Sequence, residues 1–145
     1  MKILLTGATG FVGGAVLRRL QDGPHEVHCL VRPGNEAALR ERVPPSHLHT
    51  GDLGDSASLR QALAGCDWLL HCAGLNSFWQ RVPYSGTRRR TRSPYYRVNV
   101  EGTRVVARAA RACGARLVCV STDQVFDGTK GNYAETDGPS PISVY

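Results

Sequence analysis

Short apolar runs alternate with longer segments of mixed polarity along most of the chain. Five runs are typical of buried strands: KILLTG at 2–7, HEVHCLVR at 25–32, HLHTGD at 47–52, DWLLHCAG at 67–74 and ARLVCVST at 115–122. Four longer segments carry helical patterning: FVGGAVLRRLQDG at 11–23, NEAALRERV at 35–43, DSASLRQALAG at 55–65 and PYYRVNVEGTRVVARAARACG at 94–114. This alternation predicts β-α-β units and a parallel sheet. Right-handed crossovers favour an α/β fold with a doubly wound sheet of about five strands, ordered 3-2-1-4-5.

Capping residues and apolar spacing refine the helices. Asn35 is expected at or near the cap of the second helix, and Gly65 lies just past the end of the third. In the first helix we expect one buried face to hold five apolar residues: Phe11, Val12, Ala15, Val16 and Leu20.

Composition indicates a single globular domain over residues 1–145. Apolar residues make up 41% of the chain and charged residues 21%. The net charge is +6, and residues 76–98 hold six arginines and no acid, so the basic excess lies in one tract. Residues 85–93 within it predict a mobile surface loop that trypsin cuts first; the tract could instead form a rim that attracts phosphate-bearing ligands. No nucleic-acid-reading motif accompanies the tract, so a nucleic-acid partner is not expected.

Cysteines and hydropathy bear on the compartment. The five cysteines form no C-x-x-C pair and share no metal-ligand spacing, so no metal site is expected from them. Most lie in apolar runs, which predicts buried thiols in a reducing cytoplasm. No run approaches the length of a membrane span, so no membrane association is expected.

The turn after the first strand carries the strongest chemical signal. TGATGFVG places Gly7, Gly10 and Gly13 where the first strand ends and the first helix begins. We expect Gly7 to permit the tight turn, Gly10 to let a pyrophosphate approach the backbone, and Gly13 to let the helix pack closely on the sheet. The spacing is G-x-x-G-x-x-G, and its place at a strand–helix junction predicts dinucleotide binding.

Two later positions indicate which dinucleotide is bound. CLVRPG places Arg32 and no acid at the end of the second strand, which favours the 2′-phosphate of NADP over the free ribose of NAD. The alternative is an ordinary exposed arginine. Asp52 in GDLGD could accept a hydrogen bond from the adenine amino group, although Gly-Asp is also a common turn.

These motifs together resemble an extended short-chain dehydrogenase/reductase, the group that holds the nucleotide-sugar epimerases, dehydratases and reductases. TGATGFVGG, GDLGD, DWLLHCAGL, YYRVNVEGT and VSTDQVFDG occur in that family's order. The segment from 121 to 145 is most similar to dTDP-4-dehydrorhamnose reductase. The resemblance implies a Rossmann-type fold and an NADP (or NAD) cofactor held by eleven residues: Gly7, Gly10, Phe11, Val12, Gly13, Arg32, Asp52, Leu53, Cys72, Ala73 and Gly74.

The resemblance also implies two catalytic residues. Thr122 matches the family's Ser/Thr that hydrogen-bonds the substrate carbonyl, and Tyr145 matches the tyrosine of Y-x-x-x-K. The lysine of that motif falls at position 149, beyond the sequence, as do the sixth strand and the small C-terminal substrate domain. The chain is therefore expected to be the cofactor-binding part of the enzyme, with negligible reductase activity alone and an apolar edge that favours self-association.

Several functions stay open at this point. The first is reduction of a keto group on a small molecule, a nucleotide-linked sugar. SFW at 77–79 resembles reductases of flavonoid- or steroid-like ketones, and an epimerase is a further alternative. Gln124 replaces the glutamate of the family's dehydratases, which argues against dehydration because an amide cannot abstract a proton. Outside catalysis, the chain could be a non-catalytic nucleotide-binding or regulatory module, because one similar subfamily serves as the regulatory subunit of methionine adenosyltransferase. A fragment without its own function is the last alternative. Asn99 is expected to have a structural role.

Overall fold

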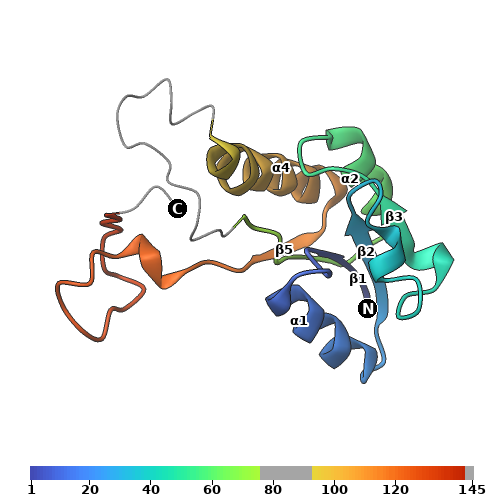
Figure 1. The fold of residues 1–145 in the computed structure, drawn as a ribbon, viewed down its shortest axis with the longest axis horizontal. Helices are drawn as coiled ribbons and strands as arrows, with labels where there is room; N and C mark the ends of the chain where they lie inside the picture. The colour runs from blue at the N-terminus through green and yellow to red at the C-terminus, as the bar shows by residue number, and fades with distance from the viewer. Residues whose placement is uncertain (76–92, 143–145) are drawn as a thin grey trace.

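The computed structural model describes residues 1–75 and 93–142 and contains one parallel sheet between two helical layers (Figure 1). The predicted strand order is confirmed as β3-β2-β1-β4-β5, with every neighbouring pair parallel. The strands are β1 (Lys2–Thr6), β2 (Glu26–Val31), β3 (Leu48–Thr50), β4 (Trp68–His71) and β5 (Arg116–Cys119). The helices are α1 (Phe11–Gln21), α2 (Ser56–Ala62) and α4 (Thr103–Cys113). Short 3₁₀ turns form η1 (Glu36–Ala38), η2 (Pro45–His47) and η4 (Asp123–Val125), and η3 (Tyr96–Gly102) is a π-helix.

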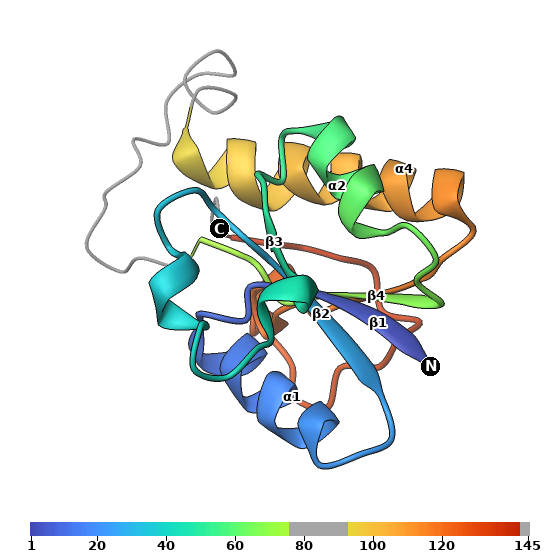
Figure 2. The ribbon, with the colours of Figure 1, turned by 90° about the vertical axis from the view of Figure 1, so that its right-hand side faces the viewer.

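The core has two halves, one on each face of the sheet. Figure 2 shows α2 and α4 on one face and α1 on the other. Successive residues of β1 and β2 pack into opposite halves of the core, because side chains along a strand point alternately to the two faces of the sheet. Leu4 and Leu30 pack with Leu59 and Val106 on the α2–α4 face, whereas Leu5 packs on the α1 face with Val27, Cys29 and Leu17. The central strands are therefore buried on both faces, as in other parallel sheets.

Two helix expectations from the sequence need correction. In α1, Val16 and Leu20 are partly buried and pack on the core as expected, but Phe11, Val12 and Ala15 are exposed, and the buried residues are Gly13, Gly14 and Leu17. The helix packs on the sheet through Gly13 and Gly14, so its buried face is rotated away from the face that the apolar residues predicted. In the segment 35–43, no α-helix forms: a 3₁₀ turn at Glu36–Ala38 is followed by a turn in which Val43 N donates to Leu39 O at 2.8 Å. Pro44 disfavours the helical conformation at Val43, which ends the segment.

The remaining helices follow the sequence more closely. Asp55 caps α2 by accepting a hydrogen bond from Ala57 N at 2.9 Å, and Gly114 ends α4 in the left-handed conformation with φ 72°. The predicted helix over 94–114 is continuous, but Tyr96–Gly102 winds as a π-helix before the α-helical part begins. π-turns of this kind are frequent at functional sites.

The cysteine expectation holds only in part. All five thiols are free, and Cys29 and Cys66 are buried. Burial raises the pKa of Cys29 to about 12. Cys113 and Cys119 are exposed, which corrects the expectation that thiols in apolar runs are buried. Cys119 belongs to β5, the edge strand, where Val118 is also 44% exposed.

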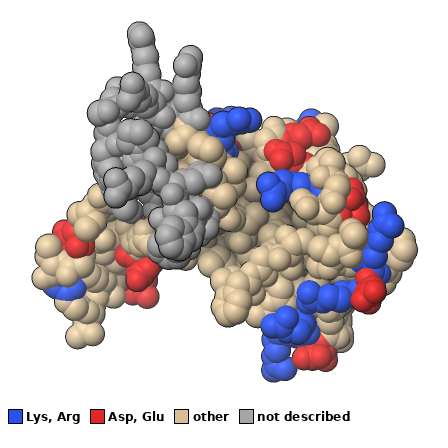
Figure 3. Space-filling view, viewed as in Figure 1, with Lys and Arg blue, Asp and Glu red and all other residues tan. Residues whose placement is uncertain are grey.

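The surface charge of the described residues is mixed. Figure 3 shows Lys and Arg side chains interspersed with Asp and Glu on the face in view. Residues 85–92 of the predicted mobile loop lie outside the described part, so the loop and its trypsin cleavage stay predictions. Ser93, the last residue of that prediction, is instead buried, and its Oγ accepts a hydrogen bond from Tyr96 N at 3.1 Å. Across residues 1–75 and 93–142, no helix is both long enough and apolar enough to cross a membrane.

Candidate dinucleotide-binding site

A cavity of about 670 Å³ lies at the carboxyl ends of β1 to β4. This is where ligands bind in open α/β sheets, and the volume falls within the usual range of about 300–1,000 Å³ for ligand sites. Loops after the four strands and one face of η3 line the cavity. Eight of the eleven predicted cofactor residues line it: Gly7, Gly10, Arg32, Asp52, Leu53, Cys72, Ala73 and Gly74.

The glycine turn shapes one wall of this cavity. Gly7 has φ +79°, and a Cβ placed there would lie 2.5 Å from Ala73 N, so the turn passes directly against the loop after β4. A Cβ on Gly13 would lie 2.1 Å from Gly7 O, which confirms the close packing expected of this glycine. Gly10 N donates to Gly7 O at 2.9 Å, and Gly10 caps α1 without a side chain. The start of α1 is thereby held at the cavity.

Three predicted cofactor residues do not line the cavity: Phe11, Val12 and Gly13. Gly13 is buried beneath the turn, while the side chains of Phe11 and Val12 point to solvent. The first N–H groups of a helix have no partner within the helix, so the backbone at this position can offer N–H groups to an anion. A lining role for their side chains finds no support.

Arg32 and Asp52 reach the cavity from the ends of β2 and β3. Arg32 is exposed, directly follows β2 and lies within the turn closed by Asn35 N donating to its carbonyl oxygen at 3.0 Å. Gly51 N donates to Val31 O at 2.8 Å, which fixes the loop after β3 beside the end of β2. Asp52 Oδ1 accepts a hydrogen bond from Gly54 N at 2.8 Å. Gly51-Asp52 therefore begins a turn, as the alternative interpretation of this pair held, and Asp52 also lines the cavity.

Asn99 ties η3 to the loop after β4. Its Oδ1 accepts from Leu75 N at 2.7 Å, and its Nδ2 donates to Leu75 O at 3.0 Å. Both hydrogen-bonding groups of one backbone residue are thus satisfied by one amide side chain, which confirms the structural role expected of Asn99. Leu75 lines the cavity, so this pair also fixes its rim.

A buried histidine supports the same wall from behind. His71 Nδ1 lies 2.7 Å from Thr6 Oγ1, and His71 Nε2 lies 3.1 Å from Thr103 Oγ1. Burial lowers the pKa of His71, because the charged imidazolium is disfavoured away from water. The neutral ring joins β1, β4 and α4, and Thr6 lines the cavity. Sequence reasoning did not identify this triad, although a polar residue within an apolar strand was a signal.

Sequence reasoning also missed the contribution of η3. Three residues of η3 and one residue just before it line the cavity: Arg97, Val98, Glu101 and Pro94. Arg104 donates to the Glu101 carboxylate and holds its pKa below the usual value. Arg32, Arg97, Asp52 and Glu101 all line the cavity, so its wall carries both signs of charge. Only the folding of the helix back over the sheet brings these positions to the strand ends.

Of the two predicted catalytic residues, the structure describes only Thr122, and it does not line the cavity. Thr122 lies beyond the carboxyl end of β5 and caps η4, where its Oγ1 accepts from Gln124 N at 3.3 Å and donates to Asp123 Oδ1 at 3.2 Å. Thr122 is not among the lining residues. Tyr145 lies outside the described residues. Both roles stay predictions.

Comparison with known families decides the assignment. The family described as NAD dependent epimerase/dehydratase matches residues 3–145. This chain belongs to that family. The resemblance drawn from the motifs is therefore confirmed, and the cavity at the strand ends occupies the cofactor position that the fold provides.

Two curated relatives illustrate the breadth of the family. A putative dihydroflavonol 4-reductase of Synechocystis sp. is 32% identical over 133 residues, which is 92% of this chain and 36% of that protein. The methionine adenosyltransferase 2 subunit beta of Rattus norvegicus is 31% identical over 147 residues, which is 99% of this chain and 39% of that protein. The chain thus spans between a third and two fifths of these relatives.

Two solved structures share the fold over the whole chain. MoeE5 in complex with UDP-glucose and NAD superposes with a TM-score of 0.73 at 29% identity, and this chain covers 44% of it. A hypothetical dTDP-4-dehydrorhamnose reductase from Sulfolobus tokodaii gives a TM-score of 0.71 at 30% identity, with 48% of that chain covered. The named relatives therefore include reductases and a protein that holds a nucleotide sugar beside NAD.

Proposed function

We propose that this chain binds NADP as the cofactor-binding part of a reductase that acts on a keto group of a nucleotide-linked sugar. The main support for this proposal is the glycine turn, which holds the start of α1 at the rim of the cavity at the strand ends. The positive end of the helix dipole and its free N–H groups favour a pyrophosphate there. Bound NADPH would supply hydride to the carbonyl carbon of the substrate.

Each predicted role then has a physical basis in this chain. Arg32 supports NADP, because an exposed guanidinium at the cavity rim can form charge-assisted hydrogen bonds with a 2′-phosphate. Asp52 can accept from the adenine amino group with the carboxylate oxygen that Gly54 N leaves free. Thr122 would orient the substrate carbonyl after exchanging its present partners, and Tyr145 would give its phenolic proton to the carbonyl oxygen.

The substrate class is supported by the relatives. MoeE5 holds UDP-glucose beside NAD, and the Sulfolobus tokodaii protein is described as a dTDP-4-dehydrorhamnose reductase. The Synechocystis sp. relative supports an aromatic ketone as the alternative substrate. A second candidate function is a non-catalytic nucleotide-binding module, which the similarity to the methionine adenosyltransferase 2 subunit beta favours.

Cofactor titration tests the proposal. We expect NADPH to bind more tightly than NADH by about 10- to 100-fold, the equivalent of one charge-assisted hydrogen bond of roughly 1.5–3 kcal/mol. Arg32→Ala should abolish the difference, whereas Arg19→Ala, which removes an exposed arginine from α1, should leave it unchanged. Fluorescence titration of both cofactors measures this.

The outcomes separate the parts of the proposal. If neither cofactor binds, dinucleotide binding itself is wrong. If both bind equally and Arg32→Ala changes nothing, only the NADP preference fails. NADPH oxidation with a panel of keto-sugars and aromatic ketones, measured on the chain joined to a relative's C-terminal part, distinguishes the reductase from the non-catalytic module.

A further inference from the structure

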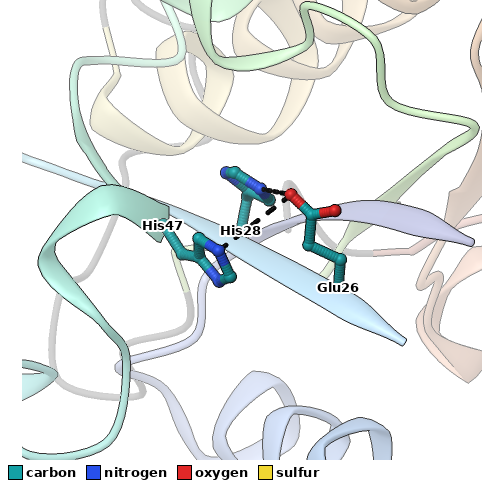
Figure 4. Close-up of side chains that lie close together, drawn as sticks. All are labelled: Glu26, His28 and His47. Atoms are coloured by element: carbon teal, nitrogen blue, oxygen red, sulfur yellow. Dashed lines mark hydrogen bonds and ion pairs between the residues drawn. The ribbon is translucent and has the colours of Figure 1, made fainter. Parts of the chain in front are cut away.

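A cluster of one carboxylate and three imidazoles lies at the amino end of β2, away from the cavity. Figure 4 shows Glu26, His28 and His47 converging, the first two from β2 and the third from η2. His28 Nε2 lies 2.7 Å from Glu26 Oε1, and His47 Nε2 lies 4.0 Å from the same oxygen. One potential ligand atom from each residue lies within 4.8 Å of the others.

The fold creates this cluster from separate segments. Glu26 and His28 are two residues apart on β2 and therefore share one face of the sheet. The parallel register pairs Cys29 with Leu48 and Leu30 with His49, so the residues around η2 and β3 come beside His28. The His28 ring stacks on His47 with centroids 4.4 Å apart and on His49 with centroids 5.1 Å apart.

We propose that Glu26, His28 and His47 form a binding site for a zinc ion. Two imidazoles and one carboxylate are a ligand set that zinc accepts in proteins, with a fourth position left for water. Tetrahedral ligands at about 2.0–2.1 Å from zinc are about 3.3 Å apart. Two of the three separations, 2.7 and 4.0 Å, lie on either side of that value, and all three are within 4.8 Å, so the ligand atoms would have to shift by at most about 1.5 Å relative to one another to bind zinc.

A second interaction orients the central ligand. His28 Nδ1 lies 2.8 Å from His49 Nε2, so His28 has a hydrogen-bonding partner for the nitrogen that does not face the site. With zinc on Nε2, the proton of His28 is on Nδ1 and points at His49, as ligating histidines usually require. His49 Nε2 can accept this hydrogen bond, and its ring also stacks on the His28 ring. His49 is thus a positioning residue.

Exposure of the cluster leaves an entry path for the ion. The His28 side chain is 6% exposed, whereas His47 is 29% and Glu26 51% exposed. The buried ligand is therefore fixed by packing, and the other two can close on the ion from solvent. Lys2 pairs with Glu26 in the register of β1 and β2, so its positive charge opposes the ion in part. Because Glu26 and His47 are 21 positions apart, the site exists only in the folded chain.

Zinc titration of the untagged full chain, freed of metal by a chelator, tests the proposal. Competition with a chromophoric zinc chelator should give one zinc per chain. Glu26→Gln and His47→Ala should each weaken binding by about tenfold or more, and His49→Phe by about 10- to 100-fold as for other orienting partners. The matched controls His25→Ala and Glu41→Gln, which change the same residue types outside the cluster, should bind as the parent does.

Cobalt absorption separates ligands from the positioning residue. Co²⁺ in the parent should give visible bands of tetrahedral type, which His47→Ala should alter and His49→Phe should preserve at higher metal concentration. Circular dichroism confirms that each variant is folded, and the half-exposed Glu26→Gln keeps the test valid if another variant unfolds. No zinc binding, or 1:1 binding that neither Glu26→Gln nor His47→Ala weakens, would overturn the proposal.

Discussion

Adding one methyl group at Gly13 tests whether close packing of α1 on β1 holds the glycine turn. A Cβ there would lie 2.1 Å from Gly7 O, whereas real Cβ contacts are rarely under 3.0 Å. The helix would have to move away from the turn by about 1 Å, and interiors packed at crystal-like density resist such shifts. Leu17, which is fully buried on the same helix, would move with it.

The magnitude follows from two opposing contributions. Overpacking of this kind costs about 1–3 kcal/mol and sometimes more, and the severity of the clash favours the upper end. Replacing glycine by alanine in a helix returns up to about 1 kcal/mol. We therefore expect Gly13→Ala to lower the free energy of unfolding by about 2 kcal/mol, which is about 4–8 °C in Tm for a domain of this size.

Gly14→Ala is the matched control, since it changes the next buried glycine of the same helix. Its Cβ would lie 3.4 Å from Ala8 O, an ordinary contact, so the same substitution should be neutral or stabilising by up to about 1 kcal/mol. Urea unfolding followed by far-UV circular dichroism measures both variants, and NADPH titration follows the turn. If Gly13→Ala is as stable as Gly14→Ala and binds NADPH equally, the packing argument is refuted.

Two other predictions concern the wall of the cavity. Asn99→Ala should lower the free energy of unfolding by about 1–3 kcal/mol, because it leaves both backbone groups of Leu75 without their partner; unchanged urea unfolding would contradict this. The lowered pKa of His71 means that the unfolded chain binds more protons below about pH 6.5, so stability should fall as pH drops below that value. The slope from this group should not exceed about 1.4 kcal/mol per pH unit, and His71→Asn should flatten the urea-unfolding profile between pH 7 and pH 5.

Local patterns predicted the strands and the glycine turn because these depend on neighbours in sequence, whereas the strand order followed from the general rules for doubly wound sheets. Apolar runs identified the buried strands, and the glycines at 7, 10 and 13 marked the junction that the structure contains. The face of α1 was mispredicted because the pattern counted Phe11 as buried, while packing on the sheet uses Gly13 and Gly14. Small residues that allow close approach do not register in a hydrophobic pattern.

Features that depend on long-range contacts were not predictable from the sequence. The η3 contribution requires a helix to lie over strand ends that precede it by many residues, and the pair Asn99–Leu75 spans 24 positions. The cluster at Glu26 requires the register of β2 and β3, which no motif specifies. Cys119 lies in an apolar run but is exposed, because its strand is the edge of the sheet.

The two proposed sites lie at opposite ends of β2, and their separation predicts that they act independently. Glu26 begins the strand and Arg32 follows its last residue, so six residue steps of about 3.3 Å place their backbones about 20 Å apart. This is about twice the Debye length of roughly 8–10 Å near physiological salt, so surface charges at the two ends are largely screened from each other. Saturating zinc should therefore change the NADPH affinity less than about twofold, a difference well below 1 kcal/mol. Because coupling between two binding sites is reciprocal, saturating NADPH should likewise change the zinc affinity less than about twofold. A tenfold change in either titration, abolished by His47→Ala, would show that the strand transmits a conformational change between its ends.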